Sequence, residues 1–199
     1  MESVAKIEYM NNYYLPLLPG EYYHIFNRGN NRNNLFYKKG NYEYFLRKYD
    51  EYLSDYIDTY AFCLLPNHFH LLIRVKESDE ISKVVSCQFR RFFISFSQAI
   101  NKQENRVGSL FQKNFKRKKV DSEKYFLRLV YYIHANPQIH GLIDNFKLYP
   151  WSSYERILSK KLSKLKKNEI LKWFGTQKEY LAFHEQLNEF KFGEDLFLE

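Results

Sequence analysis

The chain has 199 residues, of which 45% are hydrophobic and 27% are charged, a composition typical of a globular protein with a sizeable core. Lys and Arg outnumber Asp and Glu by 31 to 23, and the net charge of +8 favours a polyanionic partner such as nucleic acid over solubility alone. No apolar run is long enough to span a membrane, and the first residues do not form a signal peptide. We therefore expect a cytoplasmic protein with no membrane partner.

The pattern of apolar residues predicts alternating strands and helices. The helical segments have apolar residues at three- and four-residue steps, and the strand segments are short and rich in strand formers. In chain order, the predicted elements are a strand at 22–26, a polar loop at 27–34, a helix at 41–56, strands at 59–65 and 68–75, a helix at 80–102, a possible strand at 109–112, and helices at 124–135 and 178–190. This order predicts an α+β fold of the ferredoxin-like split βαβ type, an antiparallel sheet with helices on one face, plus a C-terminal helical extension.

Residues with capping side chains mark two of the helix starts. Asn41 is the expected N-cap of the first helix, and Asp121 or Ser122 is the expected N-cap of the 124–135 helix. That second helix is expected to end near Asn136-Pro137, because proline restricts the residue before it.

The chain divides into three parts. We expect an N-terminal lead over residues 1–20, a catalytic domain over residues 21–155, and a basic linker with a helical C-terminal extension over residues 156–199. Cys63 and Cys87 lie in apolar contexts, so both are expected to be reduced core residues.

Two histidines open the 68–75 strand. Side chains alternate between the faces of a strand, so His68 and His70 point to one face while Phe69 and Leu71 point to the other. Neutral imidazoles are good ligands for divalent ions, and such a pair also suits phosphate chemistry. The alternative is that one or both histidines only form hydrogen bonds at a strand end, and this stretch by itself leaves both interpretations open.

Two polar segments contain candidate contacts to nucleic acid. The 27–34 loop includes Asn27, Arg28 and Arg32, and an arginine can bind a phosphate or a guanine edge with two hydrogen bonds. The densest run of cations in the chain comprises Lys113, Lys116, Arg117, Lys118 and Lys119. Charge runs are usually solvated faces, but this one lies between predicted elements rather than on a tail. It therefore favours contact with a DNA or RNA backbone.

The 124–135 helix has a polar stripe beside its apolar one. Tyr132 and Asn136 are four residues apart and therefore neighbours on one helix face, and Arg128 lies one turn earlier, where it is able to hold a phosphate. Tyr131 is rotated by about 100° around the helix and has Ala135 one turn further on. In isolation, Tyr132 would be interpreted as a core aromatic residue.

Five motifs in this order resemble the single-tyrosine HUH transposases, most closely the REP-associated tyrosine transposase branch. The resemblance covers roughly residues 20 to 155, and it is the combination that is specific, since each motif alone is weak. The motifs are Asn27-Arg28-Gly29, Leu65-Pro66-Asn67-His68-Phe69-His70, Gly108-Ser109-Leu110-Phe111-Gln112, Tyr132-Ile133-His134-Ala135-Asn136-Pro137 and Trp151-Ser152-Ser153-Tyr154.

The resemblance implies a metal-dependent DNA-cutting site. His68 and His70 match the pair that binds a divalent cation, Mg²⁺ or Mn²⁺, and Tyr132 matches the nucleophile. Asn136 matches the position that completes the metal site, where the wider superfamily often has Gln. The implied activity is nicking and rejoining of single-stranded DNA with hairpins from repeated palindromes, through a 5′-phosphotyrosine intermediate. The implied assembly is a monomer or a homodimer.

Two alternatives belong to other classes. A domesticated relative would bind DNA or RNA hairpins without cutting, although such a protein would not need the intact set of His68, His70 and Tyr132. A nucleotide hydrolase of the histidine-triad type would need a third alternating histidine, and Leu72 occupies that position.

Overall fold

A four-stranded antiparallel sheet forms the centre of the computed structural model, which describes residues 15–78 and 81–189. In the order in which they lie in the sheet, the strands are β2 (Ile57–Leu65), β3 (His68–Val75), β1 (Tyr22–Arg28) and β4 (Lys116–Val120). Helix α2 (Lys39–Leu53) connects β1 to β2, and α3 (Ile81–Gln103) connects β3 to β4. This arrangement confirms the predicted α+β fold of the split βαβ type.

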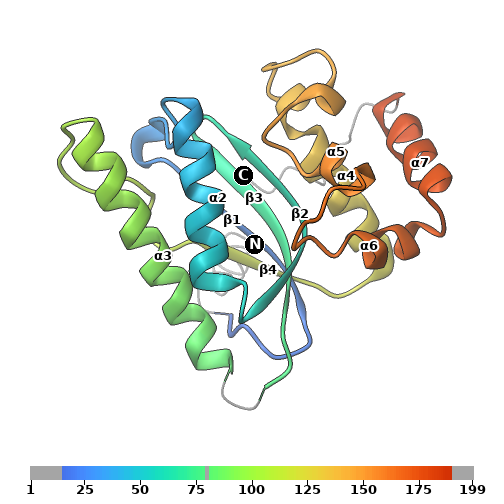
Figure 1. The fold of residues 1–199 in the computed structure, drawn as a ribbon, viewed down its shortest axis with the longest axis horizontal. Helices are drawn as coiled ribbons and strands as arrows, with labels where there is room; N and C mark the ends of the chain where they lie inside the picture. Colours follow the sequence, from blue (N-terminus) through green and yellow to red (C-terminus); the bar gives the residue numbers. More distant parts are fainter. Residues whose placement is uncertain (1–14, 79–80, 190–199) are drawn as a thin grey trace, which may run out of the picture.

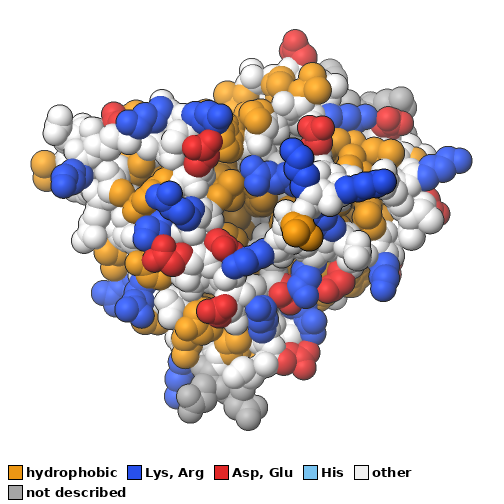
Figure 2. Space-filling model, viewed as in Figure 1, with side chains coloured by type: hydrophobic (Ala, Val, Ile, Leu, Met, Phe, Trp, Pro, Cys, Tyr) orange, Lys and Arg blue, Asp and Glu red, His pale blue; other side chains and the backbone are white. Residues whose placement is uncertain are grey.

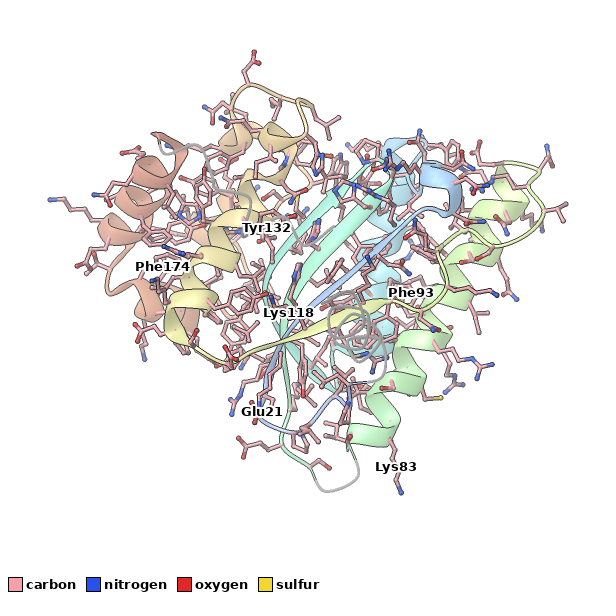
Figure 3. All side chains as sticks on the ribbon, turned by 180° about the vertical axis from the view of Figure 1, so that it is seen from behind. Glu21, Lys83, Phe93, Lys118, Tyr132 and Phe174 are labelled. Atoms are coloured by element: carbon pink, nitrogen blue, oxygen red, sulfur yellow. The ribbon has the colours of Figure 1, made fainter. Side chains whose placement is uncertain are left out.

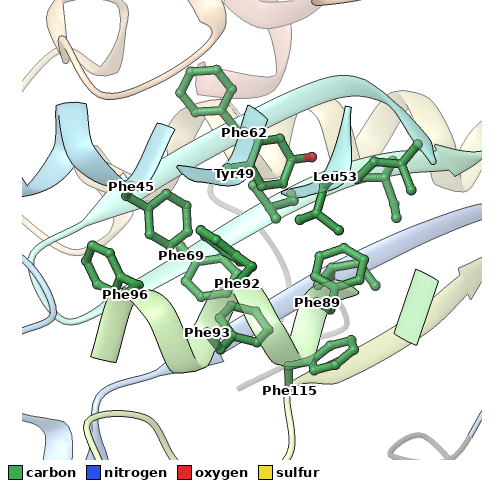
Figure 4. Packing of buried hydrophobic residues seen from close by; sticks show 14 of the residues in the cluster. Phe45, Tyr49, Leu53, Phe62, Phe69, Phe89, Phe92, Phe93, Phe96 and Phe115 are labelled. Carbon is green, nitrogen blue, oxygen red and sulfur yellow. The ribbon is translucent and has the colours of Figure 1, made fainter. Parts of the chain in front are cut away.

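An aromatic core lies between one face of the sheet and the two connecting helices, α2 and α3 (Figures 1 and 4). The ring of Phe45 on α2 lies 5.2 Å from Phe69 on β3 and 4.9 and 5.1 Å from Phe92 and Phe96 on α3, measured between centroids. Such side chains each contribute about 1.5–3 kcal/mol when fully buried. The face of β3 opposite the histidines is therefore fixed by a tightly packed layer.

Helices cover both faces of the sheet. Helices α2 and α3 share one face, as the predicted fold requires, and α4 (Glu123–Ile139) lies on the opposite face (Figure 1). The reason is that this face is apolar too: Ala61, Cys63, Leu65 and Leu72 are buried beneath α4 in a second core cluster. The remaining C-terminal helices, which pack in the same cluster, are α5 (Tyr154–Leu158), α6 (Lys167–Phe174) and α7 (Gln177–Glu189).

Helix boundaries differ from the sequence prediction at two points. Helix α2 begins at Lys39 after its N-cap Lys38, and Asn41 instead accepts hydrogen bonds from the backbone N–H groups of Tyr37 and Lys38 through Oδ1. Helix α4 has the expected Ser122 cap but continues through Pro137 to Ile139. The next turn is closed by the N–H of His140, which donates to the carbonyl of Asn136 over 3.0 Å.

The predictions for the strands and for one cysteine also differ from the structure. Strand β1 extends through Arg28 into the predicted loop, and residues 109–112 contribute an isolated bridge, Gly29 to Phe111, rather than a strand. Cys63 is buried as expected, and burial raises the pKa of its thiol. Cys87 is exposed, because it falls on the outer side of α3. Within the part of the chain that the structure describes, no helix is both long and apolar enough to cross a bilayer.

A buried chain of hydrogen bonds attaches the C-terminal helices to α4. His184 on α7 donates from Nδ1 to the carbonyl of Tyr180 over 2.8 Å, so its Nε2 must accept from Nδ1–H of His134 on α4, 3.0 Å away. Nε2 of His134 then accepts from the hydroxyl of Ser153 over 2.8 Å, and Ser153 Oγ accepts from the N–H of Phe62 on β2. Burial lowers the pKa of His184 to about 4, so the ring is neutral in the folded protein at neutral pH.

We predict that this ring makes stability depend on pH. The unfolded chain has a histidine pKa near ~6.5 and so binds more protons than the folded chain between about pH 4 and 6.5, which means that stability falls as the pH drops through this window. The expected loss from His184 is on the order of 3 kcal/mol at pH 4. Urea unfolding between pH 7 and 4.5 measures this loss. The free energy of unfolding should change less steeply with pH in His184→Gln than in the wild type. Equal slopes in both proteins would contradict the assignment.

Candidate active site

The structure brings the predicted histidines, tyrosine and asparagine together on one face of the sheet. The rings of His68 and His70 lie 5.2 Å apart and nearly perpendicular, and the ring of Tyr132 on α4 lies 5.4 Å from His70 (Figure 3 labels Tyr132). Oδ1 of Asn136, one turn further along α4, is 3.1 Å from Nε2 of His68. All four side chains are buried, and Tyr132 is only 2% exposed. The chain therefore positions them by packing rather than by mobile loops.

The orientation of His68 is determined by its neighbour. Asn67 donates from Nδ2 to the carbonyl of Arg32 over 3.3 Å, which turns its Oδ1 toward His68. Nδ1 of His68 lies 2.7 Å from that oxygen and must be the donor, because an amide oxygen only accepts. In neutral His68 the lone pair is then on Nε2, which faces Asn136.

These donor atoms fit the expected divalent cation. Nε2 of His68 and Oδ1 of Asn136 are two acceptors only 3.1 Å apart, close to the separation of about 2.9 Å between adjacent ligands of an octahedral Mg²⁺ ion. Nδ2 of Asn136 is buried and has no hydrogen-bond partner among the described residues, and the contact with Nε2 of His68 relates this amide to the histidine pair. No group of three His, Cys, Asp or Glu side chains suited to a metal occurs in the described ranges.

Sequence reasoning missed His24, which joins the site from β1. Its Nε2 is 3.0 Å from Nδ1 of His70, and the two rings are stacked with centroids 5.1 Å apart. Burial, followed by the charges of His70 and Lys118, lowers the pKa of His24 well below its ordinary value. The alternation of the 22–26 strand placed His24 on one face with Tyr22 and Phe26, but only the pairing of β1 with β3 shows that this is the face of His70.

The loop after β1 lies beside the histidine pair. Asn27 and Arg28 line a small cavity of about 40 Å³ together with both histidines. The other residues lining this cavity are Phe26, Gln112 and Lys116. Gly29 is required next to it, because a Cβ there would lie 1.9 Å from the carbonyl oxygen of Asn33. Arg32 is exposed and contributes its carbonyl to the bond with Asn67.

Strand β4 divides the basic run between the two faces of the sheet. Lys116 and Lys118 pair in register with Phe26 and His24, so they share the face of His70 (Figure 3 labels Lys118). The ammonium of Lys116 lies 5.6 Å from the ring centroid of Phe26. These two lysines are therefore the members of the run placed beside the candidate site.

Arg117 and Lys119 point to the other face. The guanidinium of Arg117 donates to the carbonyl of Leu15 and to the hydroxyl of Ser86 on α3, and it lies 4.3 Å from the ring centroid of Phe115. The guanidinium of Arg117 is thus bonded within the protein, and its expected contact with DNA stays a prediction. Lys119 forms an ion pair with Glu21 at 2.9 Å. Two further cations expected to contact nucleic acid, Lys113 and Arg128, are exposed.

A hollow on the surface that is far larger than the cavity beside the histidines lies elsewhere. Figure 2 shows it between α2 and the C-terminal segments, and it has a volume of about 620 Å³. Phe62 and Leu71, which line it, belong to the core on the α2 side of the sheet. The candidate site lies on the opposite face, which shows that cavity size is a poor guide to the chemistry here.

The family comparison decides the identity of the chain. A family model described as IS200-like transposase matches residues 19–136, more than half of the chain, and this span contains both histidines, Tyr132 and Asn136. The chain belongs to the IS200-like transposase family.

Two relatives of this transposase support the assignment. A candidate REP-associated tyrosine transposase of Haemophilus influenzae is 29% identical over 127 residues, which cover 53% of this chain and 72% of the relative. The solved structure of a REP-associated tyrosine transposase bound to a REP hairpin has a TM-score of 0.61 and 21% identity, covering 74% of this chain and 84% of the other. The structural match confirms that the transposase has the fold of that protein.

We predict that removing a positive charge destabilises the protein on one face of β4 and not on the other. Arg117→Gln removes a half-buried guanidinium from two acceptors and an aromatic ring, so it should lower the free energy of unfolding by about 1–3 kcal/mol. Lys118→Gln should change it by less than about 0.5 kcal/mol. Urea denaturation of the transposase measures both. Equal losses in the two variants would contradict the division of the basic run.

Proposed function

We propose that this transposase nicks and rejoins single-stranded DNA at hairpin-forming repeats through a covalent bond to Tyr132. The observation that carries the proposal is the position of Tyr132 and Asn136 on α4 directly over His68 and His70, beside Lys116 and Lys118 of β4. A tyrosine, a metal-type ligand set and a basic strand edge on one sheet face suit phosphoryl transfer on DNA.

In the proposed reaction, the phenol oxygen of Tyr132 attacks the scissile phosphorus and the bond from phosphorus to the 3′ oxygen breaks. The products are a 5′-phosphotyrosine and a free 3′-hydroxyl, which takes up a proton as the phenol loses one. The phosphodiester link retains the bond energy, so a second 3′-hydroxyl is able to reverse the step and join new strands. One tyrosine therefore suffices for both cutting and joining.

His68, His70 and Asn136 are the residues that would hold the divalent cation, Mg²⁺ or Mn²⁺. When bound, such an ion withdraws charge from the phosphate and stabilises the leaving oxygen. The protein contributes placement: Asn67 orients His68, and the packing of α4 sets the distance from Tyr132 to the histidine pair. Burial of these groups excludes water and strengthens their electrostatic effect on a bound phosphate.

The domain organisation and partners follow from the same geometry. All proposed site residues lie within residues 21–155, which we assign as the catalytic domain, and residues 156–199 form an extension whose helices pack against α4. The histidines and Tyr132 meet within one chain, which favours action as a monomer over a dimer with shared sites. The relative bound to a REP hairpin supports hairpin DNA as the partner.

We predict that Tyr132→Phe abolishes covalent protein–DNA adducts on a single-stranded hairpin oligonucleotide in the presence of Mg²⁺ or Mn²⁺, because the attacking oxygen is removed. Denaturing gels with end-labelled DNA detect the adduct. Tyr131→Phe is the matched control, since it removes a hydroxyl from the adjacent buried residue of the same helix and should leave adducts intact. Adducts that persist in Tyr132→Phe would contradict the nucleophile, and hairpin binding without any adduct in the wild type would favour the non-cleaving binder.

We predict that Lys116→Gln with Lys118→Gln weakens binding of single-stranded DNA and lowers the slope of log K against log salt concentration by about 1.4, since two phosphate contacts are lost. Fluorescence anisotropy at several salt concentrations measures the slope. Lys160→Gln with Lys161→Gln is the control, because it changes the net charge equally on the segment before α6. A matching loss in both pairs would show that the effect is general rather than local to β4.

A further inference from the structure

His24 is held against His70 by packing on several sides. It is fully buried, its ring stacks on Phe26 at 4.5 Å, and its ring edge meets Tyr132 at 6.3 Å. The 3.0 Å bond from Nε2 of His24 to Nδ1 of His70 is therefore fixed in place. Rotation of His24 away from His70 would displace Phe26 on one side or Tyr132 on the other.

A hydrogen bond between two imidazoles needs one donor and one acceptor, so this pair has two arrangements when both rings are neutral. If His24 donates from Nε2, then Nδ1 of His70 accepts and the proton of His70 is on Nε2, which leaves no lone pair there for a cation. If His70 donates from Nδ1, its Nε2 carries a lone pair and is able to bind a cation. The direction of this bond thus decides whether His70 is a competent ligand.

The two arrangements place the buried protons differently. When His70 donates from Nδ1, the proton of His24 is on its own Nδ1, which is buried and makes no hydrogen bond within the described residues. When His24 donates, the proton of His70 is instead on its buried Nε2. Each arrangement therefore carries one N–H on a buried nitrogen, which is unfavourable without an acceptor. A cation on Nε2 of His70 is compatible only with the arrangement in which His70 donates.

We infer that His24 is a positioning residue that holds His70 as a cation ligand, and that a bound cation fixes the direction of the hydrogen bond between them, from Nδ1 of His70 to Nε2 of His24. The inference rests on the proposed cation site at His68, His70 and Asn136. In that arrangement both rings are neutral and both carry their proton on Nδ1. His24 thereby takes the place that a carboxylate or a backbone carbonyl usually takes behind a metal-bound histidine. Because this acceptor is neutral, cation binding is weaker and more readily reversed than with a carboxylate.

The first test follows the two rings directly in the wild-type protein. Nitrogen-15 NMR distinguishes protonated from unprotonated ring nitrogens, and Mg²⁺ is diamagnetic and so leaves the signals observable. We expect the proton to be on Nδ1 of both His24 and His70 with saturating Mg²⁺. A proton on Nε2 of either ring at saturation would overturn the inference.

The second test measures Mn²⁺ affinity, with the free ion followed by electron paramagnetic resonance. His24→Phe keeps an aromatic ring for stacking but removes the acceptor, and it should weaken binding by about tenfold or more. His24→Gln restores an acceptor and should return the affinity to within about threefold of the wild type. Thermal unfolding of each variant shows that it is folded, and the NMR test holds even if one is not.

Failure of the proposed cation site and failure of the role of His24 give different results. If wild-type Mn²⁺ binding is absent, or is unaffected by His68→Ala with His70→Ala, the proposed cation site itself is wrong. If binding depends on His68 and His70 but is the same in folded His24→Phe and wild type, only the role of His24 is wrong.

Discussion

The packing of α4 across one face of the sheet is the interaction on which the candidate site depends. Leu129, Val130 and Ile133 share a buried cluster with the apolar side chains of β2 and β3, and this contact fixes both the rotation and the height of the helix. The contacts of Tyr132 and Asn136 with the histidine pair are too weak to position the helix by themselves. They reach it because the apolar stripe next to them is driven out of water, which is worth far more than any one polar contact in the site.

This helix is held from both sides. On the sheet side, β3 is backed by the aromatic layer of α2 and α3, so the strand that carries His68 and His70 has little freedom to move (Figure 4). On the outer side, His134 connects α4 to α7 through His184 and to β2 through Ser153. His134 lies between Tyr132 and Asn136 in the sequence but points away from them. The C-terminal extension is thus mechanically joined to the helix that carries the proposed nucleophile.

The polar groups of the site are arranged by backbone geometry rather than by charge. Asn67 orients His68 because the carbonyl of Arg32 orients Asn67, and His24 meets His70 because two strands are paired in one register. The same alternation of side chains separates Lys116 and Lys118 from Arg117 and Lys119. A run of cations that looks uniform in sequence therefore has two physical roles, one facing the site and one attaching β4 to its neighbours.

The sequence by itself determined whatever depends on short-range periodicity. It placed His68 and His70 on one strand face, put Tyr132 one turn from Asn136, and predicted the order of β1, α2, β2, β3, α3 and α4 that the structure confirms. Tertiary structure decided the rest: that α4 covers the face of the histidine pair, that His24 lies behind His70, and that Arg117 is bonded to Leu15 and Ser86. These facts rest on strand register and on contacts between residues far apart in the chain. Local pattern carries no information about them, because the apolar area buried when separate elements meet selects the pairing.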